Sequence, residues 1–120
     1  MKLRVYSYAG CDTCKKALQF LAERKIAHEV VPIREQPPAL AELRAMLGYV
    51  DGELRRLFNT SGQDYKVMNM KERLPKLSVD EALGLLEKNG NLVKRPFVIS
   101  KGIGTVGFKQ DEWERLFAAR

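Results

Sequence analysis

The chain has 120 residues, of which 45% are hydrophobic and 30% charged, and a formal net charge of +6. This length suits one domain, spanning residues 1–120, that can bury a core without a metal or a disulfide. No apolar run is as long as a membrane span, and the first residues lead into a strand pattern rather than a signal-peptide core, so we expect a cytoplasmic protein. The positive charge alone does not choose between a nucleic acid, an acidic partner and an oxyanion.

The first third of the chain predicts a strand, a helix and a second strand. Leu3–Tyr8 alternates apolar and polar residues, and Ala9-Gly10 forms a turn. A helix from Thr13 to Arg24 and a strand from Ile26 to Ile33 follow. Because such crossovers are right-handed and join neighbouring strands, we expect the two strands to be parallel neighbours.

The middle of the chain predicts helices, after Gln36-Pro37-Pro38 breaks the strand pattern. A helix is predicted over Ala39–Leu47, ended by Gly48, and a turn at Asp51-Gly52 follows it. The next predicted segments are helical turns over 53–58, a loop over 59–66, and a short helix and turn over 67–75. A last helix runs from the N-cap Ser78 to Lys88.

The end of the chain predicts a hairpin and a helix. Phe97–Ser100 reads as a central strand, with Pro96 confined to its first position because proline has no N–H to donate. Lys101–Gly104 is the predicted hairpin turn and Thr105–Phe108 the returning strand. The last helix, Asp111–Ala118, would bury Trp113, Leu116 and Phe117.

Both cysteines lie at the junction of the first strand and helix, as Cys11-Asp-Thr-Cys14. One helical turn separates them, which is close enough for a disulfide. The unpaired N–H groups at the helix start, with the charges of Lys15 and Lys16, favour a thiolate at Cys11. We therefore predict that Cys11 is the nucleophile and that Cys14, more buried in the first turn, is the resolving thiol.

Other interpretations of the cysteines are half of a zinc site, a structural disulfide and an inert pair. Zinc needs four ligands, and His28 is the only histidine of the chain, so we expect no metal. A disulfide across so short a loop would restrict the unfolded chain little. His28 should lie at the strand end opposite to Cys11, where a solvated or packed residue is the simpler interpretation.

Four motifs in this order resemble the arsenate reductase-like (ArsC/Spx) family over nearly the whole chain. They are Gly10-Cys-Asp-Thr-Cys-Lys-Lys-Ala17, Leu57-Phe-Asn59, Lys94-Arg-Pro-Phe97, and Val106-Gly-Phe108 before a helix that contains tryptophan. The resemblance implies an α/β thioredoxin/glutaredoxin-like fold with a mixed four-stranded sheet. Residues 1–34 and 92–120 would form this core and residues 37–90 a helical insertion. It also implies a cis peptide before Pro96, facing the cysteine loop.

The resemblance also implies which residues bind the substrate. In the family's arsenate reductases an arginine triad holds the oxyanion beside the thiolate. Arg95 matches one arginine and Arg55 a second, whereas Phe108 replaces the third, which argues against arsenate as the substrate. The predicted catalytic residues are thus Cys11, Cys14 and Arg95, and the predicted substrate-binding residues are Arg55, Gly10, Thr13, Lys15 and Pro96. A solvated or ion-paired surface arginine is the alternative for Arg55 and Arg95.

Two functions fit these motifs. The first is a monomeric thiol-dependent oxidoreductase that acts on a small oxyanion or a disulfide, with no cofactor and with glutathione, a glutaredoxin or a thioredoxin as reductant. The second is an Spx-like redox-sensing transcriptional regulator that binds RNA polymerase. Direct nucleic-acid binding is not expected, because the basic residues are scattered and no reader motif is present. No membrane partner is expected either.

Overall fold

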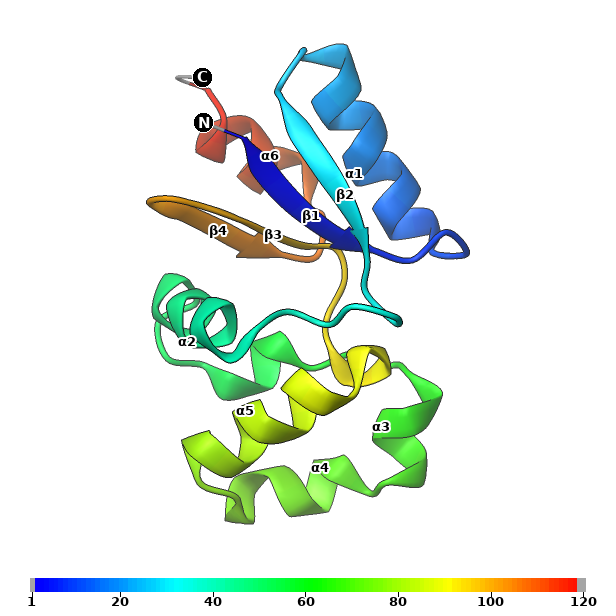
Figure 1. The fold of residues 1–120 in the computed structure, drawn as a ribbon, viewed down its shortest axis with the longest axis vertical. Helices are drawn as coiled ribbons and strands as arrows, with labels where there is room; N and C mark the ends of the chain where they lie inside the picture. Colours follow the sequence, from blue (N-terminus) through cyan, green and yellow to red (C-terminus); the bar gives the residue numbers. More distant parts are fainter. Residues whose placement is uncertain (1, 119–120) are drawn as a thin grey trace.

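The computed structural model describes residues 2–118, which form a mixed four-stranded sheet flanked by helices (Figure 1). The strand order is β2-β1-β3-β4. Strand β1 pairs parallel with β2 and antiparallel with β3, which pairs antiparallel with β4. The strands are β1 (Leu3–Ser7), β2 (His28–Pro32), β3 (Phe97–Ser100) and β4 (Ile103–Val106). This arrangement confirms the predicted thioredoxin-like sheet and its parallel first pair.

Helices cover both faces of the sheet. The two helices on one face are α1 (Asp12–Glu23) and α6 (Gln110–Leu116). The segment between β2 and β3 is helical and lies below the sheet in Figure 1. It contains α2 (Leu40–Tyr49), α3 (Gln63–Val67), α4 (Met70–Arg73) and α5 (Val79–Lys88), and the short 3-10 helices η1 (Leu54–Leu57), η2 (Leu74–Lys76) and η3 (Gly90–Leu92).

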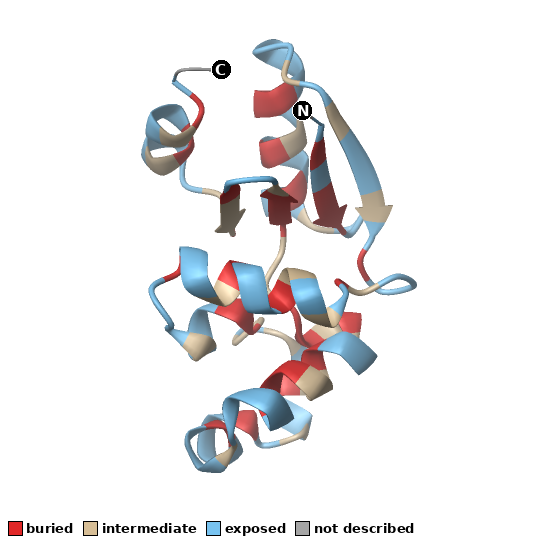
Figure 2. Ribbon diagram, turned by 60° about the vertical axis from the view of Figure 1, so that its left-hand side comes forward, coloured by how far each residue is buried: buried red, intermediate tan, exposed pale blue. Residues whose placement is uncertain are grey.

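Side chains along β1 alternate between two hydrophobic clusters, one on each face of the sheet. Figure 2 marks the buried residues in red along the ribbon. Leu3 and Val5 pack with α1 and α6, in the cluster that contains Trp113. Tyr6 points to the other face, where it joins the core of the helical segment, and its ring meets Phe97 edge-on at 5.6 Å. Alternate residues of β1 therefore contact different sets of helices, one set on each face of the sheet.

Glu42 links the first helix of the insertion to the sheet. Its Oε1 accepts the hydroxyl of Tyr6 and the backbone N–H of Ala39, the latter at 3.1 Å. Its Oε2 accepts Nη1 of Arg4 at 3.0 Å. Burial, followed by the hydrogen bond to Glu42, raises the pKa of Tyr6 to about 12. One carboxylate thus caps α2 and holds it against β1.

The predicted start of α5 is confirmed in detail. Ser78 Oγ accepts the N–H of Glu81 at 3.1 Å, and the Glu81 carboxylate accepts the N–H of Ser78 at 2.9 Å. This reciprocal pair satisfies two donors that the first helical turn leaves free.

Two glycines have other roles than the sequence predicts. Gly48 does not end α2, which continues to Tyr49, because the chain reverses later, at Asp51 and Gly52, where φ is 59° and 77°. Gly104 lies within β4 rather than in the hairpin turn, which is made by Lys101 and Gly102. A Cβ at Gly104 would lie 2.4 Å from the ring of Tyr49, so this glycine makes room for a side chain of α2.

The predicted loop over 59–66 is also partly wrong, because α3 begins at Gln63. The sequence there is polar and has no capping side chain, so local signals were weak. Tyr65 is 6% exposed and packs against Phe58 with ring centroids 6.2 Å apart, so tertiary burial stabilises this short helix. In the described part of the chain no helix is both long enough and apolar enough to cross a membrane.

Candidate functional site

Cys11 and Cys14 lie in the loop that joins β1 to the first turn of α1. Cys11 is the N-cap of the helix, and its own N–H donates to the carbonyl of Tyr8 at 3.0 Å. The N–H of Cys14 donates to Sγ of Cys11 at 3.3 Å. Both cysteines are thiols here, not a disulfide. A backbone donor of the helix end therefore points at the first sulfur, as the sequence predicted.

The two thiols differ in their surroundings. Cys11 is partly exposed, whereas Cys14 is only 1% exposed. Burial, and then the contact with Cys11, raises the pKa of the Cys14 thiol well above its usual value, while the backbone of Tyr8 and, to a smaller extent, the positive charge of Arg95 oppose that rise. Because a buried thiolate is poorly solvated, Cys14 stays protonated near neutral pH. Cys11 is the sulfur that a molecule from solvent can reach.

Arg95 and Pro96 lie beside the cysteine loop, and the peptide between them is cis. Nη2 of Arg95 donates to the carbonyl of Asn91 at 3.3 Å, and its guanidinium carbon lies 5.5 Å from the centroid of the Tyr8 ring. Pro96 is buried, and its carbonyl accepts the N–H of Gly107 at 2.9 Å. The guanidinium of Arg95 therefore contacts η3 on one side and the loop that follows β1 on the other.

A cavity of about 660 Å³ opens next to this cluster. Its walls come from the start of α1, from η1 and from the segment that follows β4, and among the residues that line it are Thr13, Arg55, Arg56, Phe58, Lys94 and Phe108. The wall from η1 is fixed by a pair of hydrogen bonds, from Lys94 N–H to the carbonyl of Leu57 at 2.8 Å and from Asn59 N–H to that of Leu92 at 2.7 Å. The cavity thus lies alongside the cysteines, and Cys11 is not part of its lining.

The predicted site residues fall into two neighbouring groups. Gly10, Cys11, Cys14 and Arg95 gather at the cysteine loop, whereas Thr13 and Arg55 face the cavity. Gly10 lies against Tyr8, because a Cβ there would be 2.8 Å from that ring. Lys15 contributes its backbone N–H to the carbonyl of Cys11 at 3.1 Å, and the residue is exposed. Pro96 connects Arg95 to β3.

Phe108 is partly buried and adds an apolar ring to the wall of the cavity. Its ring packs edge-on against Phe20 at 5.8 Å and Trp113 at 4.8 Å, so it belongs to the aromatic cluster between α1 and α6. The next residue, Lys109, also lines the cavity, and its ammonium lies 3.7 Å from the carboxylate of Glu112. A cation is therefore present one position after Phe108, and the sequence analysis missed it.

Arg34 was also missed. It follows Ile33, whose N–H donates to the carbonyl of Ser7 at 2.9 Å, and its guanidinium carbon lies 4.8 Å from the centroid of the Tyr8 ring. The signal was in the topology: β1 and β2 are parallel, so the segment that follows β2 emerges at the same edge as the cysteine loop.

His28 lies far from this edge. It pairs with Leu3 at the start of β2, and its Nδ1 is 2.7 Å from the carbonyl of Ile26. This position confirms that the histidine is at the end of the sheet away from Cys11. In residues 2–118 no group of three or more His, Cys, Asp or Glu side chains is arranged to hold a metal ion.

A mixed sheet with two thiols at its first strand-to-helix junction and a cis-proline turn beside them defines a thioredoxin-like protein with a Cys-x-x-Cys motif. The sequence matches the ArsC family over residues 6–116, and the chain belongs to that family.

Two curated relatives span most of the chain. The uncharacterized protein YusI of Bacillus subtilis is 42% identical, with 98% of this chain and 100% of that protein covered. The global transcriptional regulator Spx of Enterococcus faecalis is 29% identical, with 95% of this chain and 85% of that protein covered. The chain is thus similar both to a protein without an assigned activity and to a regulator.

Two solved structures share the fold and sequence similarity. An ArsC family related protein from Bacteroides fragilis superposes with a TM-score of 0.90 at 38% identity, covering 97% of this chain and 98% of that one. A protein from Streptococcus mutans described as a possible arsenate reductase gives a TM-score of 0.85 at 34% identity, covering 93% of this chain and 97% of that one.

Proposed function

We propose that this ArsC family member is a thiol-dependent oxidoreductase, with Cys11 as nucleophile and Cys14 as resolving thiol. The observation that carries the proposal is the asymmetry of two adjacent thiols: a partly exposed Cys11 whose sulfur accepts the Cys14 N–H at 3.3 Å, and a Cys14 that is 1% exposed. In exchange by a cysteine pair, the accessible cysteine attacks the substrate and the protected one nearby resolves the mixed disulfide.

The exchange has two steps. The Cys11 thiolate attacks one sulfur of a disulfide, forms a new S–S bond with it and releases the other sulfur as a thiolate that takes a proton from water. Cys14 then gives its proton to water and attacks Cys11, forming the Cys11–Cys14 disulfide and releasing the second thiolate. The substrate disulfide gains two electrons and the cysteine pair loses them. An external thiol must return them, and we propose glutathione or a glutaredoxin or thioredoxin for this role.

Arg95 would assist the second step through its charge. It already opposes the rise in the pKa of Cys14, so it lowers the cost of forming the second thiolate. Its hydrogen bond to Asn91 and its contact with Tyr8 hold it in place before a substrate arrives. The side chain is therefore positioned to act without reorganisation.

A disulfide suits this site better than arsenate. A tetrahedral oxyanion beside a thiolate needs several fixed cationic donors, and the ring of Phe108 lies within the aromatic cluster where an arginine was expected. Lys109 is paired with Glu112, which reduces the charge it offers. We therefore expect disulfides to be reduced faster than arsenate when both are supplied with the same reductant.

The test is turnover of glutathione disulfide and of a neutral hydroxyethyl disulfide, with a thioredoxin or glutaredoxin system as electron source. We expect turnover above the protein-free background with the natural chain and only that background with Cys11→Ser. Without the reducing system, Cys14→Ser should stop after the first step as a mixed disulfide at Cys11, visible by mass spectrometry. Equal activity of Cys11→Ser and the natural chain would refute the proposal.

The second candidate is a redox-sensing regulator that binds RNA polymerase. It is supported by the similarity to Spx of Enterococcus faecalis, at 29% identity over 95% of this chain. A pull-down with purified RNA polymerase, using the reduced and the oxidised protein, distinguishes the two. Redox-dependent binding without disulfide turnover would favour the regulator, whereas turnover without binding favours the enzyme.

A further inference from the structure

Two arginines from different parts of the chain meet at the ring of Tyr8, next to Cys11. The guanidinium carbon of Arg34 lies 4.8 Å from the ring centroid and that of Arg95 lies 5.5 Å from it. The ring itself lies against Gly10, which precedes Cys11. Tyr8, Arg34 and Arg95, called here the Tyr8 cluster, therefore bring two positive charges to the cysteine loop.

The 3-10 helix η3 positions both arginines of the Tyr8 cluster. The carbonyl of Asn91 accepts the hydrogen bond from Arg95 at 3.3 Å. Gly90 packs against the backbone after β2: a Cβ there would lie 1.8 Å from the carbonyl oxygen of Ile33 and 3.0 Å from Cα of Arg34. Only a residue without a side chain permits this approach, and it fixes where the backbone of Arg34 leaves the sheet.

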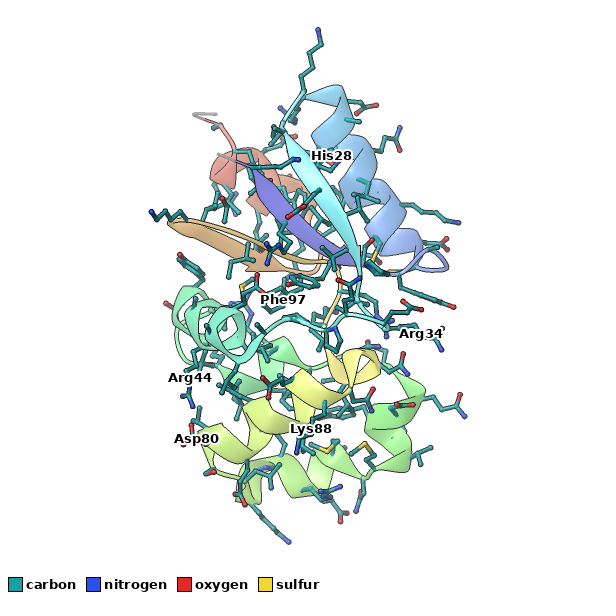
Figure 3. All side chains as sticks on the ribbon, in the orientation of Figure 1. His28, Arg34, Arg44, Asp80, Lys88 and Phe97 are labelled. Atoms are coloured by element: carbon teal, nitrogen blue, oxygen red, sulfur yellow. The ribbon has the colours of Figure 1, made fainter. Side chains whose placement is uncertain are left out.

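Among the described residues, Arg34 has no acidic partner, in contrast to Arg4 and Arg24. Within residues 2–118, Arg4 and Arg24 form ion pairs with carboxylates, whereas Arg34 forms none and makes no side-chain hydrogen bond. The residue is exposed, and Figure 3 shows it on the side of the molecule opposite to Arg44 and Asp80. Its forked N–H donors are available to a ligand.

We propose that Arg34, placed beside Arg95 by the ring of Tyr8, binds a carboxylate of the disulfide that Cys11 attacks. The assignment rests on the proposed function and specifies its substrate class: disulfides of thiols that carry a carboxylate. A guanidinium pairs with a planar carboxylate through two parallel hydrogen bonds. Contact with an aromatic ring limits the orientations of the side chain, so less conformational entropy is lost when the carboxylate binds.

The experiment compares two probes on the reduced protein. One is dithiobis(nitrobenzoate), a disulfide with two carboxylates, and the other is dithiodipyridine, which has none. The second-order rate constants at low ionic strength give a ratio, anionic over neutral, that cancels any general change in the reactivity of Cys11. We expect Arg34→Ala to lower this ratio about fivefold, the size of one charge pair near a protein surface, and salt to reduce the effect.

Three variants complete the test. Arg34→Lys keeps the positive charge and should therefore keep most of the ratio. The remaining loss is expected because an ammonium lacks the two parallel N–H donors of the guanidinium. Tyr8→Leu removes the ring that Arg34 contacts and should lower the ratio, because the guanidinium then loses its fixed position. Arg44→Ala is the matched control: it removes the same charge from an exposed position, where Arg44 pairs with Asp80 at 2.6 Å, and should leave the ratio unchanged.

The outcomes separate the two proposals. An Arg34→Ala ratio equal to that of the natural chain, or an equal loss in Arg44→Ala, would overturn the assignment of Arg34 while the proposed function stands. A neutral-probe rate that is the same in Cys11→Ser as in the natural chain would overturn the proposed function, and this assignment with it.

Discussion

Cys11 and Cys14 differ in exposure because of where the helix begins. Cys11 is the N-cap, outside the first turn, and Cys14 is the third residue of α1, on the face that packs on the sheet. The helix end supplies an N–H to the outer sulfur, and the core excludes water from the inner one. Two residues of the same type, three positions apart, thereby acquire different chemistry.

Alkylation should therefore be selective. With limiting iodoacetamide at pH 7 we expect the reduced protein to be modified at Cys11, with Cys14 at least about tenfold slower, because the thiolate is the reacting form. Peptide mass spectrometry identifies the modified cysteine. In urea the difference should disappear, and equal labelling of the two cysteines in the folded protein would contradict this account.

The buried thiol of Cys14 also predicts how stability depends on pH. Its pKa is raised in the folded state, so the folded protein holds this proton more tightly than the unfolded chain. The free energy of unfolding should be unaffected below the unfolded pKa, about 8.5, and should fall as the pH rises above it.

The size of this loss should be about 1–2 kcal/mol between pH 8.5 and pH 10, since one pKa unit corresponds to about 1.4 kcal/mol. Urea unfolding of Cys11→Ser, in which Cys14 is the only thiol, gives the loss. Cys11→Ser/Cys14→Ala is the control, because Tyr6 and the other titrating groups are common to both. The same pH dependence in the two variants would show that Cys14 does not resist ionisation.

At the scale of elements, helices and strands with local signals could be predicted from the sequence. The capping box of Ser78 and Glu81, the alternation in β1 and the apolar run of β3 are each complete within a few residues. The roles of the glycines could not be predicted in this way. Gly104, for example, is needed because the ring of Tyr49, far away in the chain, packs against its backbone. A glycine that is needed for packing looks the same in sequence as one that is needed for a turn.

Gly90 and Gly84 offer a direct test of such packing. Gly90→Ala would place a Cβ 1.8 Å from the backbone oxygen of Ile33, so we expect it to lower the free energy of unfolding by about 3 kcal/mol or more. A Cβ added at Gly84, inside α5, would meet no atom from outside its helix within 4 Å. Gly84→Ala should therefore raise the free energy of unfolding by about 0.5–1 kcal/mol. Urea unfolding compares the two. A similar effect in both variants would contradict the packing at η3.

Over the whole molecule the positive charge is unevenly distributed. Residues 37–90 contain eight basic and eight acidic side chains, whereas the rest of the chain contains thirteen basic and seven acidic ones. The net charge of +6 therefore belongs to the part that carries the sheet and the cysteines. A field of this sign attracts anionic substrates toward that part of the molecule.

The candidate site could be predicted only in part for the same long-range reason. The cysteines and Arg95 stand in short motifs, and their gathering at one edge follows from the βαβ unit. Arg34 and Lys109 stand in no motif, and three-dimensional contacts with Tyr8 and with the cavity distinguish them from other surface cations. The roles of Arg34 and Lys109 depend on residues that are distant in sequence, so they can be recognised only in the folded structure.

The measurement that tests the central claim most directly is the reduction potential of the Cys11–Cys14 couple. The protein would be equilibrated in thiol–disulfide buffers and the reduced fraction determined by alkylation and mass spectrometry. We expect a reversible disulfide between the two cysteines, with a potential in the range of thioredoxins and glutaredoxins, roughly −270 to −200 mV. If no disulfide forms between Cys11 and Cys14 even in the most oxidising buffer, the pair is not a redox couple and the proposed chemistry is wrong.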